Sequence, residues 1–445
     1  MIYREFKDAV VKYAVENAVT DYELYYEESE STKAEIFREE VKGYSSSNAM
    51  GICFRCIVDG KTGYASTENM TEEEAKSLVL RAMDNAGSIE SEEESFIHKQ
   101  GDNYAVCGEE KEAAPNGSEI IDMALALQRE LYRADGRVTD GTQSAAAHIG
   151  ETYAICNSNG LDLEDKVSYD ACYCLPLVEA DGEMYDGFAD RRGNRKEFDL
   201  KALAGKAVED AVSCIGAGSV ASGKYTVLIS GKAMATLLGT FSSVFSAEQA
   251  QKGMSLLAGK EGENIAAEGI TIVDDPRYED SAAKRTFDGE GVAAYAKNVV
   301  EKGRLVTLLH NLKTAARAGV KSTGNASKTS YAAVVGVSPF TFYISSGEGT
   351  KEELFSAAGE GIYVTEVTGL HAGANPVTGD FSLSSKGFLV KAGRKDAPVK
   401  NFTISGNFFA LLKEIERTGA DLEFVNGRFG SPTVMVRDMA VAGNQ

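Results

Sequence analysis

The pattern of apolar residues changes at residues 216–223, and this change constrains the fold more than any other feature of the sequence. Before it, helical and strand-like patterns alternate, whereas short apolar runs separated by glycine-rich turns predominate after it. Many short strands at such spacing favour a barrel-like or sandwich-like sheet. We therefore expect an α+β protein: a helix-flanked N-terminal α/β region, then a mainly antiparallel, barrel-like β C-terminal domain.

The segment at the change, Gly216-Ala-Gly-Ser-Val-Ala-Ser-Gly223, is rich in glycine and serine. Exposed, flexible segments of this composition commonly join domains. It predicts an N-terminal α+β domain over residues 1–217 and a β-rich domain over residues 223–445. The first of these divides further into candidate subregions 1–107 and 117–217.

Amphipathic spacing and capping residues predict the individual elements of the chain. Asp59-Gly60 is a strong hairpin dipeptide between two strand-like runs. Further strands are expected over residues 21–29, 33–47 and 144–188. The expected helices cover residues 4–19, 71–85, 117–134, 199–212, 232–258, 350–358 and 407–417.

Charge and hydropathy exclude several classes of function. The 445 residues carry a formal net charge of -21, with 67 acidic and 46 basic side chains. Binding to phosphate backbones needs clustered Lys and Arg, so direct nucleic-acid binding is disfavoured. No apolar run reaches the length of a membrane span, and the first residues indicate a helix and not a signal peptide. We expect a cytoplasmic protein that does not bind membranes.

Residues that bind metals or act as nucleophiles are sparse and poorly spaced. Cys53 and Cys56 form a C-x-x-C within a strand-like run, where buried cysteines are the simpler interpretation. The four histidines are all far apart, so no H-E-x-x-H helix can form. A Gly-x-Ser-x-Gly elbow is also absent from the sequence. No self-contained hydrolytic site is therefore recognisable.

The stretch from Tyr363 to Ser382 concentrates polar side chains among glycines. One interpretation is a tight β-turn in which side chains bond their own backbone. The other is a cleft wall that hydrogen-bonds a substrate or a partner. The candidate cleft residues are Glu366, His371, Asn375, Thr378 and Asp380.

Five ordered blocks resemble the TldD/PmbA family, which has been called modulators of DNA gyrase and is placed among metallopeptidases. The resemblance spans essentially the whole chain, and the F-S-A-E-Q-x-Q-K-G block is typical of the PmbA branch, also called TldE. The blocks are Gly51-x-x-x-Arg55 through Gly63-Tyr-Ala-Ser66, Phe245 through Ser255, Gly259 through Asp274-Asp275-Pro, Lys321 through Asn325-Ala, and Val377-Thr-Gly-Asp380-Phe-Ser.

The resemblance also implies what this chain lacks. The TldD branch carries H-E-x-x-x-H on a helix and a further cysteine ligand nearer the C-terminus. In this chain Gly239 and Val244 stand at the approximate positions of the two histidines, Thr240 stands at that of the glutamate, and no cysteine follows Cys214. The resemblance therefore implies no metal and no catalytic residue in this chain, with zinc in a TldD-like partner.

Three functions follow from these observations as alternatives. The first is a noncatalytic subunit of a TldD/TldE heterodimer that degrades or processes unfolded peptides, including peptide maturation of the microcin type. The second is a stand-alone homodimer that binds peptides or regulates a partner without cleaving anything. The third is a hydrolase with another site, for which His371 and Asp380 are the candidates.

Overall fold

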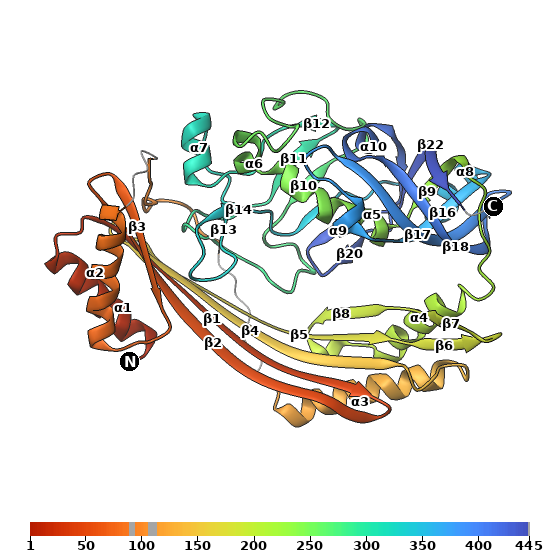
Figure 1. The fold of residues 1–445 in the computed structure, drawn as a ribbon, viewed down its shortest axis with the longest axis horizontal. Helices are drawn as coiled ribbons and strands as arrows, with labels where there is room; N and C mark the ends of the chain where they lie inside the picture. The colour runs from red at the N-terminus through yellow and green to blue at the C-terminus, as the bar shows by residue number, and fades with distance from the viewer. Residues whose placement is uncertain (89–93, 106–113, 444–445) are drawn as a thin grey trace.

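The computed structural model describes residues 1–88, 94–105 and 114–443. The subregion boundary expected at residue 107 lies outside these residues. The fold is α+β, as predicted, with a long curved antiparallel sheet in the N-terminal half and a closed five-stranded barrel in the C-terminal half (Figure 1).

The N-terminal sheet has the strand order β3-β2-β1-β4-β5-β8, and every neighbouring pair is antiparallel. Its longest strands curve beneath the C-terminal half of the molecule (Figure 1). A separate hairpin, β6–β7, lies near one end. The strands are β1 (Asp21–Phe37), β2 (Glu40–Val58), β3 (Lys61–Thr67), β4 (Gln143–Asn157), β5 (Asp162–Leu175), β6 (Leu177–Ala180), β7 (Glu183–Asp186) and β8 (Ala189–Gly193).

Two helix pairs pack on one face of this sheet, because alternate residues of each strand point to that face. The pair α1 (Tyr3–Glu16) and α2 (Glu72–Ser88) covers one end around Leu24 and Phe54. The pair α3 (Gly117–Ala134) and α4 (Leu200–Val212) covers the other end around Ile36. The middle of this face lies between the two pairs, and the opposite face meets the C-terminal half through Tyr25, Tyr153 and Phe287.

The turns of the sheet test two predictions. Asp59 and Gly60 both have positive φ, of 49° and 75°, so the predicted hairpin is confirmed. Strands were correctly expected over residues 21–29 and 33–47, but their bounds were wrong, because β1 runs unbroken from Asp21 to Phe37. The turn falls at Arg38 and Glu39, which adopt φ of 54° and 57° without the glycine that usually marks such a turn.

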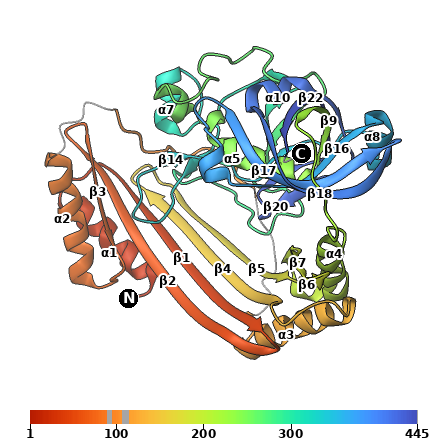
Figure 2. The same cartoon turned by 45° about the vertical axis from the view of Figure 1, so that its right-hand side comes forward.

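The C-terminal barrel joins β18-β17-β16-β9-β22 and closes through the pairing of β18 with β22 (Figure 2). The pairing of β9 with β16 is parallel, and the other barrel pairs are antiparallel. β19 pairs with β22 outside the closed ring. These strands are β9 (Gly223–Ile229), β16 (Gly361–Thr368), β17 (Asp380–Lys391), β18 (Arg394–Asn407), β19 (Ile415–Thr418) and β22 (Val434–Ala442).

A second sheet in this half has the order β12-β11-β10-β15-β21-β20. Helix α5 (Gly231–Phe241) contacts both β21 and the barrel strand β16, and its Met234, Leu238 and Phe241 are fully buried. The remaining strands are β10 (Ile272–Asp274), β11 (Lys297–Glu301), β12 (Arg304–Leu305), β15 (Phe342–Ile344), β20 (Glu423–Val425) and β21 (Phe429–Ser431), with the small pair β13 (Ala326–Ser327) and β14 (Gly336–Val337).

The long helix expected over residues 232–258 was wrong. Helix α5 ends at Phe241, residues Ser242–Phe245 form a 3₁₀ turn, and α6 covers only Ala247–Gln251. The chain turns because Phe245 and Ala247 exchange backbone hydrogen bonds with Leu309. The other helices are α8 (Lys351–Ala358) and α10 (Phe408–Glu414), which were expected, and α7 (Leu312–Ala318) and α9 (Leu370–Gly373), which were not.

Specific polar contacts connect the two halves of the molecule. Asp165 on β5 accepts hydrogen bonds from the backbone N–H and the hydroxyl of Thr286, at 2.7 and 2.6 Å. Lys400 on β18 pairs with Glu183 at 2.8 Å.

No helix in the described part of the chain combines the length and the apolar character that a membrane crossing requires.

Candidate functional site

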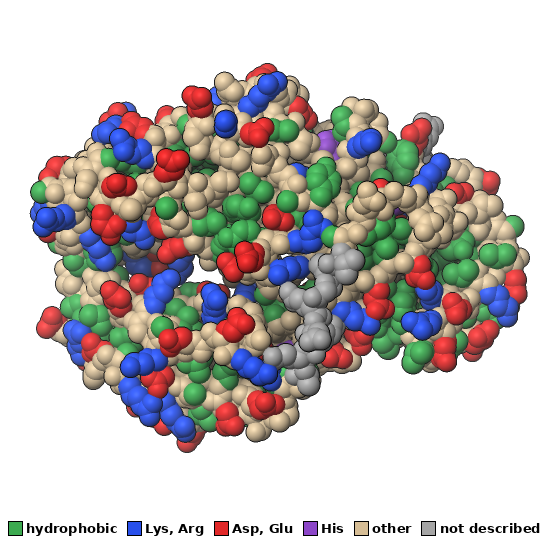
Figure 3. All heavy atoms as spheres, turned by 180° about the vertical axis from the view of Figure 1, so that it is seen from behind, with side chains coloured by type: hydrophobic (Ala, Val, Ile, Leu, Met, Phe, Trp, Pro, Cys, Tyr) green, Lys and Arg blue, Asp and Glu red, His purple; other side chains and the backbone are tan. Residues whose placement is uncertain are grey.

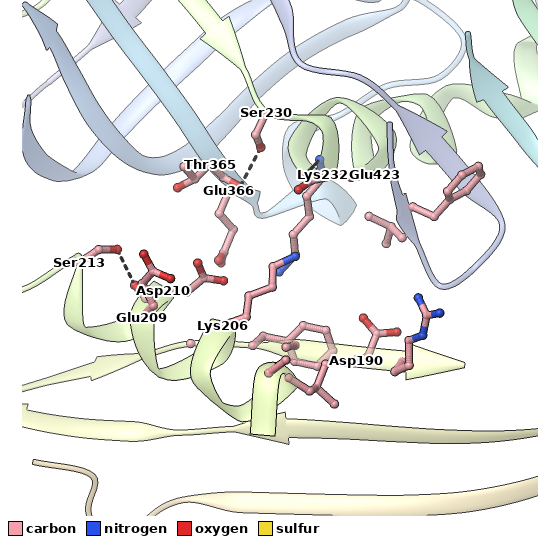
Figure 4. Close-up of a pocket in the computed structure, with 18 of the residues that line it drawn as sticks. Asp190, Lys206, Glu209, Asp210, Ser213, Ser230, Lys232, Thr365, Glu366 and Glu423 are labelled. Atoms are coloured by element: carbon pink, nitrogen blue, oxygen red, sulfur yellow. Dashed lines mark hydrogen bonds between the residues drawn. The ribbon is translucent and has the colours of Figure 1, made fainter. Parts of the chain in front are cut away.

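A cavity of about 840 Å³ lies where α4 and the β7–β8 segment face the C-terminal half. Its other wall comes from β16, the start of α5, and β20 (Figure 4). In the space-filling view from behind, a hollow is open between the two halves, and acidic and basic side chains gather around it (Figure 3). Charged side chains from both halves therefore face one shared space.

Helix α4 supplies one charged wall of the cavity. Asp199 caps this helix by accepting from the backbone N–H of Ala202, which fixes where the helix begins. Helical spacing then brings Lys206, Glu209 and Asp210 to the cavity (Figure 4).

Helix α5 supplies the facing wall. Ser230 is its N-cap: its Oγ accepts from the backbone N–H of Ala233 and donates to the carbonyl oxygen of Thr365 on β16. Lys232 follows in the first turn, and its side chain extends toward that of Lys206 across the cavity (Figure 4). The backbone N–H of Lys232 donates to Glu423 on β20 at 3.1 Å.

The electrostatics of the cavity follow from burial opposed by mixed charges. Burial raises the pKa of Asp210 above its ordinary value, while Lys232 and Lys206 act in the opposite direction. Burial disfavours the charge of Lys386, but Glu366 at 3.0 Å and Asp186 outweigh it, so the pKa of Lys386 is raised. The site therefore presents fixed positive charge beside carboxylates, which suits a ligand that carries both signs.

Of the five residues predicted for the cleft, Glu366 alone lines this cavity. It projects from β16 into the space (Figure 4) and holds Lys386, which also reaches Asp186 on β7 at 3.5 Å. His371 lies on the short helix α9, exposed to solvent.

The other three predicted residues meet in an exposed turn at the start of β17. Asn375 Oδ1 accepts from the backbone N–H of Val377 and Thr378, at 3.0 and 3.4 Å. Asp380 accepts from the side-chain amide of Asn407 at 2.9 Å, and its backbone N–H donates to Thr378. These contacts are those of a side-chain-capped turn. A role in binding stays a prediction for His371 and for this turn.

The positions that match the H-E-x-x-x-H motif do not suit a metal. Gly239 has no side chain, and a β-carbon built there would lie 2.9 Å from the ring of Phe429. Thr240 donates its hydroxyl hydrogen to the carbonyl oxygen of Thr236, and Val244 is buried in the apolar core. A zinc site needs several nitrogen, sulfur or carboxylate ligands converging on one point. Within the described ranges, no group of three or more His, Cys, Asp or Glu residues could hold a metal ion.

The cavity lysines were not predicted from the sequence. Lys206, Lys232 and Lys386 come from separate elements of both halves of the chain, so no local motif links them. The one available signal was the position of Lys206 on the polar face of a predicted helix. The cysteine interpretation fits the structure, because Cys53 and Cys56 are both free and buried on β2.

Sequence comparisons connect almost the whole chain to one family. Profiles described as PmbA/TldA metallopeptidase domain 1, central domain and C-terminal domain match residues 22–86, 110–215 and 222–443. An uncharacterised protein of Methanocaldococcus jannaschii is 29% identical over 428 residues, which cover 93% of this chain and 95% of that protein. The metalloprotease PmbA of Escherichia coli O157:H7 is 25% identical over 73% of this chain and 70% of its own length.

Solved structures resemble the full chain as well. A Thermotoga maritima protein that bears the name of DNA gyrase modulator superposes with a TM-score of 0.90, at 29% identity, over 99% of this chain and all of its own. TldE from Thermococcus kodakarensis superposes with a TM-score of 0.87 at 20% identity, over 98% of this chain and all of its own. The latter likeness shows a shared fold.

Proposed function

This chain belongs to the PmbA/TldD metallopeptidase family, and from that premise we propose that it is the noncatalytic subunit of a TldD/TldE-type zinc peptidase. Its partner is a TldD-like chain. Together the two chains degrade or mature unfolded or flexible peptides. The partner's zinc supplies the activated water for peptide hydrolysis. This chain supplies structure and substrate contacts.

One observation carries the proposal: the side chains at the motif positions cannot bind a metal. The ring of Phe429 lies against Gly239, in the direction that a histidine side chain would take. Thr240 is bonded to its own helix, and Val244 belongs to the apolar core. This part of the chain supports a helix-packing role in place of catalysis.

The charged cavity gives the subunit a part in substrate binding. An unfolded peptide carries both charge signs at its ends and along its side chains. Lys206 and Lys232 offer cations for carboxylates, and Glu209 offers an anion for ammonium and guanidinium groups. Glu366 is already paired with Lys386. Complementary charges of this kind speed the encounter with peptides that carry charge and orient them in the cavity.

Metal content and assembly test the proposal together. The isolated chain is dialysed against zinc, and bound zinc is measured by atomic spectrometry; a TldD-like protein from the same source is treated in parallel. We expect stoichiometric zinc in the TldD-like protein and none in this chain. When the two are mixed, we expect sedimentation velocity to show a species heavier than either protein. Stoichiometric zinc in this chain would contradict the proposal. If this chain forms a homodimer that does not bind the TldD-like protein, the result would instead support the stand-alone peptide-binding alternative.

A further inference from the structure

A second cavity, of about 600 Å³, lies at the edge of β5 beyond the end of β8. Residues from β4, β5 and β8 line it, together with Arg195 and residues 279–282 of the C-terminal half. The proposed peptidase function does not involve this cavity.

A serine, a histidine and an aspartate form a continuous hydrogen-bonded chain at this cavity. Ser168 Oγ lies 3.3 Å from His148 Nε2. His148 Nδ1 lies 2.8 Å from Asp170 Oδ1. The contact between the base and its carboxylate is a short hydrogen bond, and the contact between the serine and the base has the slightly longer distance that such pairs often show without substrate.

The strand register produces this arrangement. His148 on β4 stands directly opposite Asp170 on β5, so their side chains share a face. Ser168 precedes Asp170 by two residues on the same strand and therefore points to that face too. Gly150, opposite Ser168, has only Glu30 within 4 Å of where a side chain would begin. The space beside the serine is therefore open.

The aspartate is held independently of the histidine. Asp170 is 4% exposed, and its Oδ2 accepts from the backbone N–H and from Nη1 of Arg195, both at 3.2 Å. The fixed carboxylate accepts a hydrogen bond from His148 Nδ1–H. This tautomer leaves the lone pair of Nε2 facing the serine hydroxyl. Ser168 itself is only partly buried, so a substrate can reach it.

We propose that Ser168, His148 and Asp170 form a metal-independent acyl-transfer site that hydrolyses small carboxylic esters. Ser168 Oγ bonds to the ester carbonyl carbon while its proton passes to His148 Nε2. The C–O bond to the alcohol then breaks, and the alcohol leaves with the proton from His148, which gives an acyl-serine. Water bonds to the acyl carbon, loses a proton to His148, and the carboxylic acid departs as Ser168 regains its proton.

The cavity also holds a cation near the serine. Lys166 lies two residues before Ser168 on the same strand face and lines the same cavity, where its ammonium pairs with Glu164 at 2.5 Å. Stabilisation of the oxyanion by Lys166 therefore requires that substrate binding releases this ion pair. The cavity volume is in the range of sites for small molecules. The same three side-chain roles recur on unrelated folds, which is why the missing Gly-x-Ser-x-Gly elbow does not exclude them here.

Covalent labelling tests the site in the full chain. The protein is treated with a fluorophosphonate probe, the labelled residue is located by mass spectrometry, and hydrolysis of 4-nitrophenyl butyrate is followed with and without a zinc chelator. We expect labelling at Ser168 and chelator-resistant hydrolysis. Both should fall by about 100-fold or more in Ser168→Ala and in His148→Gln. Ser45→Ala, a change at an exposed serine of β2, is the matched control and should match the wild type.

A second variant separates catalysis from folding. Gly150→Val keeps all three residues, suits a strand, and fills the space beside Ser168. We expect an unchanged circular dichroism spectrum and melting temperature, with labelling reduced by at least about tenfold. Labelling elsewhere, or hydrolysis that persists in Ser168→Ala, would overturn the proposal. Hydrolysis that the chelator abolishes would also overturn the acyl-transfer proposal. That result would leave the separate proposal of a zinc peptidase formed with a TldD-like partner standing.

Discussion

Replacing Gly239 by alanine measures how tightly the motif position of α5 is packed. In a helix interior, glycine to alanine normally stabilises by about 0.5–1 kcal/mol, because alanine loses less backbone entropy on folding. At this position the new β-carbon would lie 2.9 Å from Cδ2 and 3.0 Å from Cγ of Phe429. Carbon atoms prefer separations of about 3.5–4.0 Å, and overpacking costs about 1–3 kcal/mol. We expect a net loss of about 0–2 kcal/mol.

The matched control is Gly205→Ala in α4. Gly205 is also inside a helix, but no atom lies within 4 Å of where its β-carbon would stand. This variant should gain about 0.5–1 kcal/mol. Urea unfolding followed by circular dichroism gives both changes on one scale, and the two variants should differ by about 1–3 kcal/mol.

A double-mutant cycle assigns the cause. In a Phe429→Ala background the clash is absent, so Gly239→Ala should become neutral or stabilising. If Gly239→Ala stabilises the protein as much as Gly205→Ala does, then the Phe429 ring moves aside at little cost in free energy. The packing argument against a metal ligand at position 239 would then fail.

Three further changes probe other parts of the molecule. Asp165→Asn should destabilise by about 1–3 kcal/mol in urea unfolding, since a buried acceptor of two hydrogen bonds is weakened; no change would mean that this contact does not join the halves. Burial lowers the pKa of His310 below 6.5, so the unfolded chain binds a proton that the folded chain does not. Stability should therefore fall as the pH drops below about 6.5, by at most about 1.4 kcal/mol per pH unit, and His310→Gln should remove that part of the slope in melting curves. The double variant Lys206→Ala, Lys232→Ala should raise the Kd of the mixed complex for an unstructured peptide by about tenfold, as measured by fluorescence anisotropy. The control Lys201→Ala, at an exposed residue of α4, should leave that Kd unchanged.

Local signals in the sequence predicted local structure well. The Asp59-Gly60 hairpin and the helix over residues 117–134 were both predicted, because turn chemistry and caps act within a few residues. Asn116 caps that helix reciprocally with Glu119. The barrel strands were expected from their short apolar runs, whereas closure of the barrel depends on the long-range pairing of β18 with β22.

Tertiary contacts decided what the sequence left open. The helix expected over residues 232–258 stops at Phe241 because the backbone beyond it pairs with Leu309, far along the chain. His148 and Asp170 are separated by 22 residues, and only the register of β4 with β5 brings them together. The large cavity likewise needs both halves, since Lys206 and Glu366 come from opposite walls. Glu366 was the predicted cleft residue that the fold brought to it.

Hydrolysis of an unstructured peptide is the most direct test of the noncatalytic-subunit assignment. Three samples are compared, each with and without a zinc chelator: this chain, a TldD-like protein from the same source, and their mixture. The account predicts hydrolysis in the mixture that the chelator abolishes, and none by this chain. Zinc-dependent peptide hydrolysis by this chain alone, or equal activity of the partner with and without it, would contradict the account.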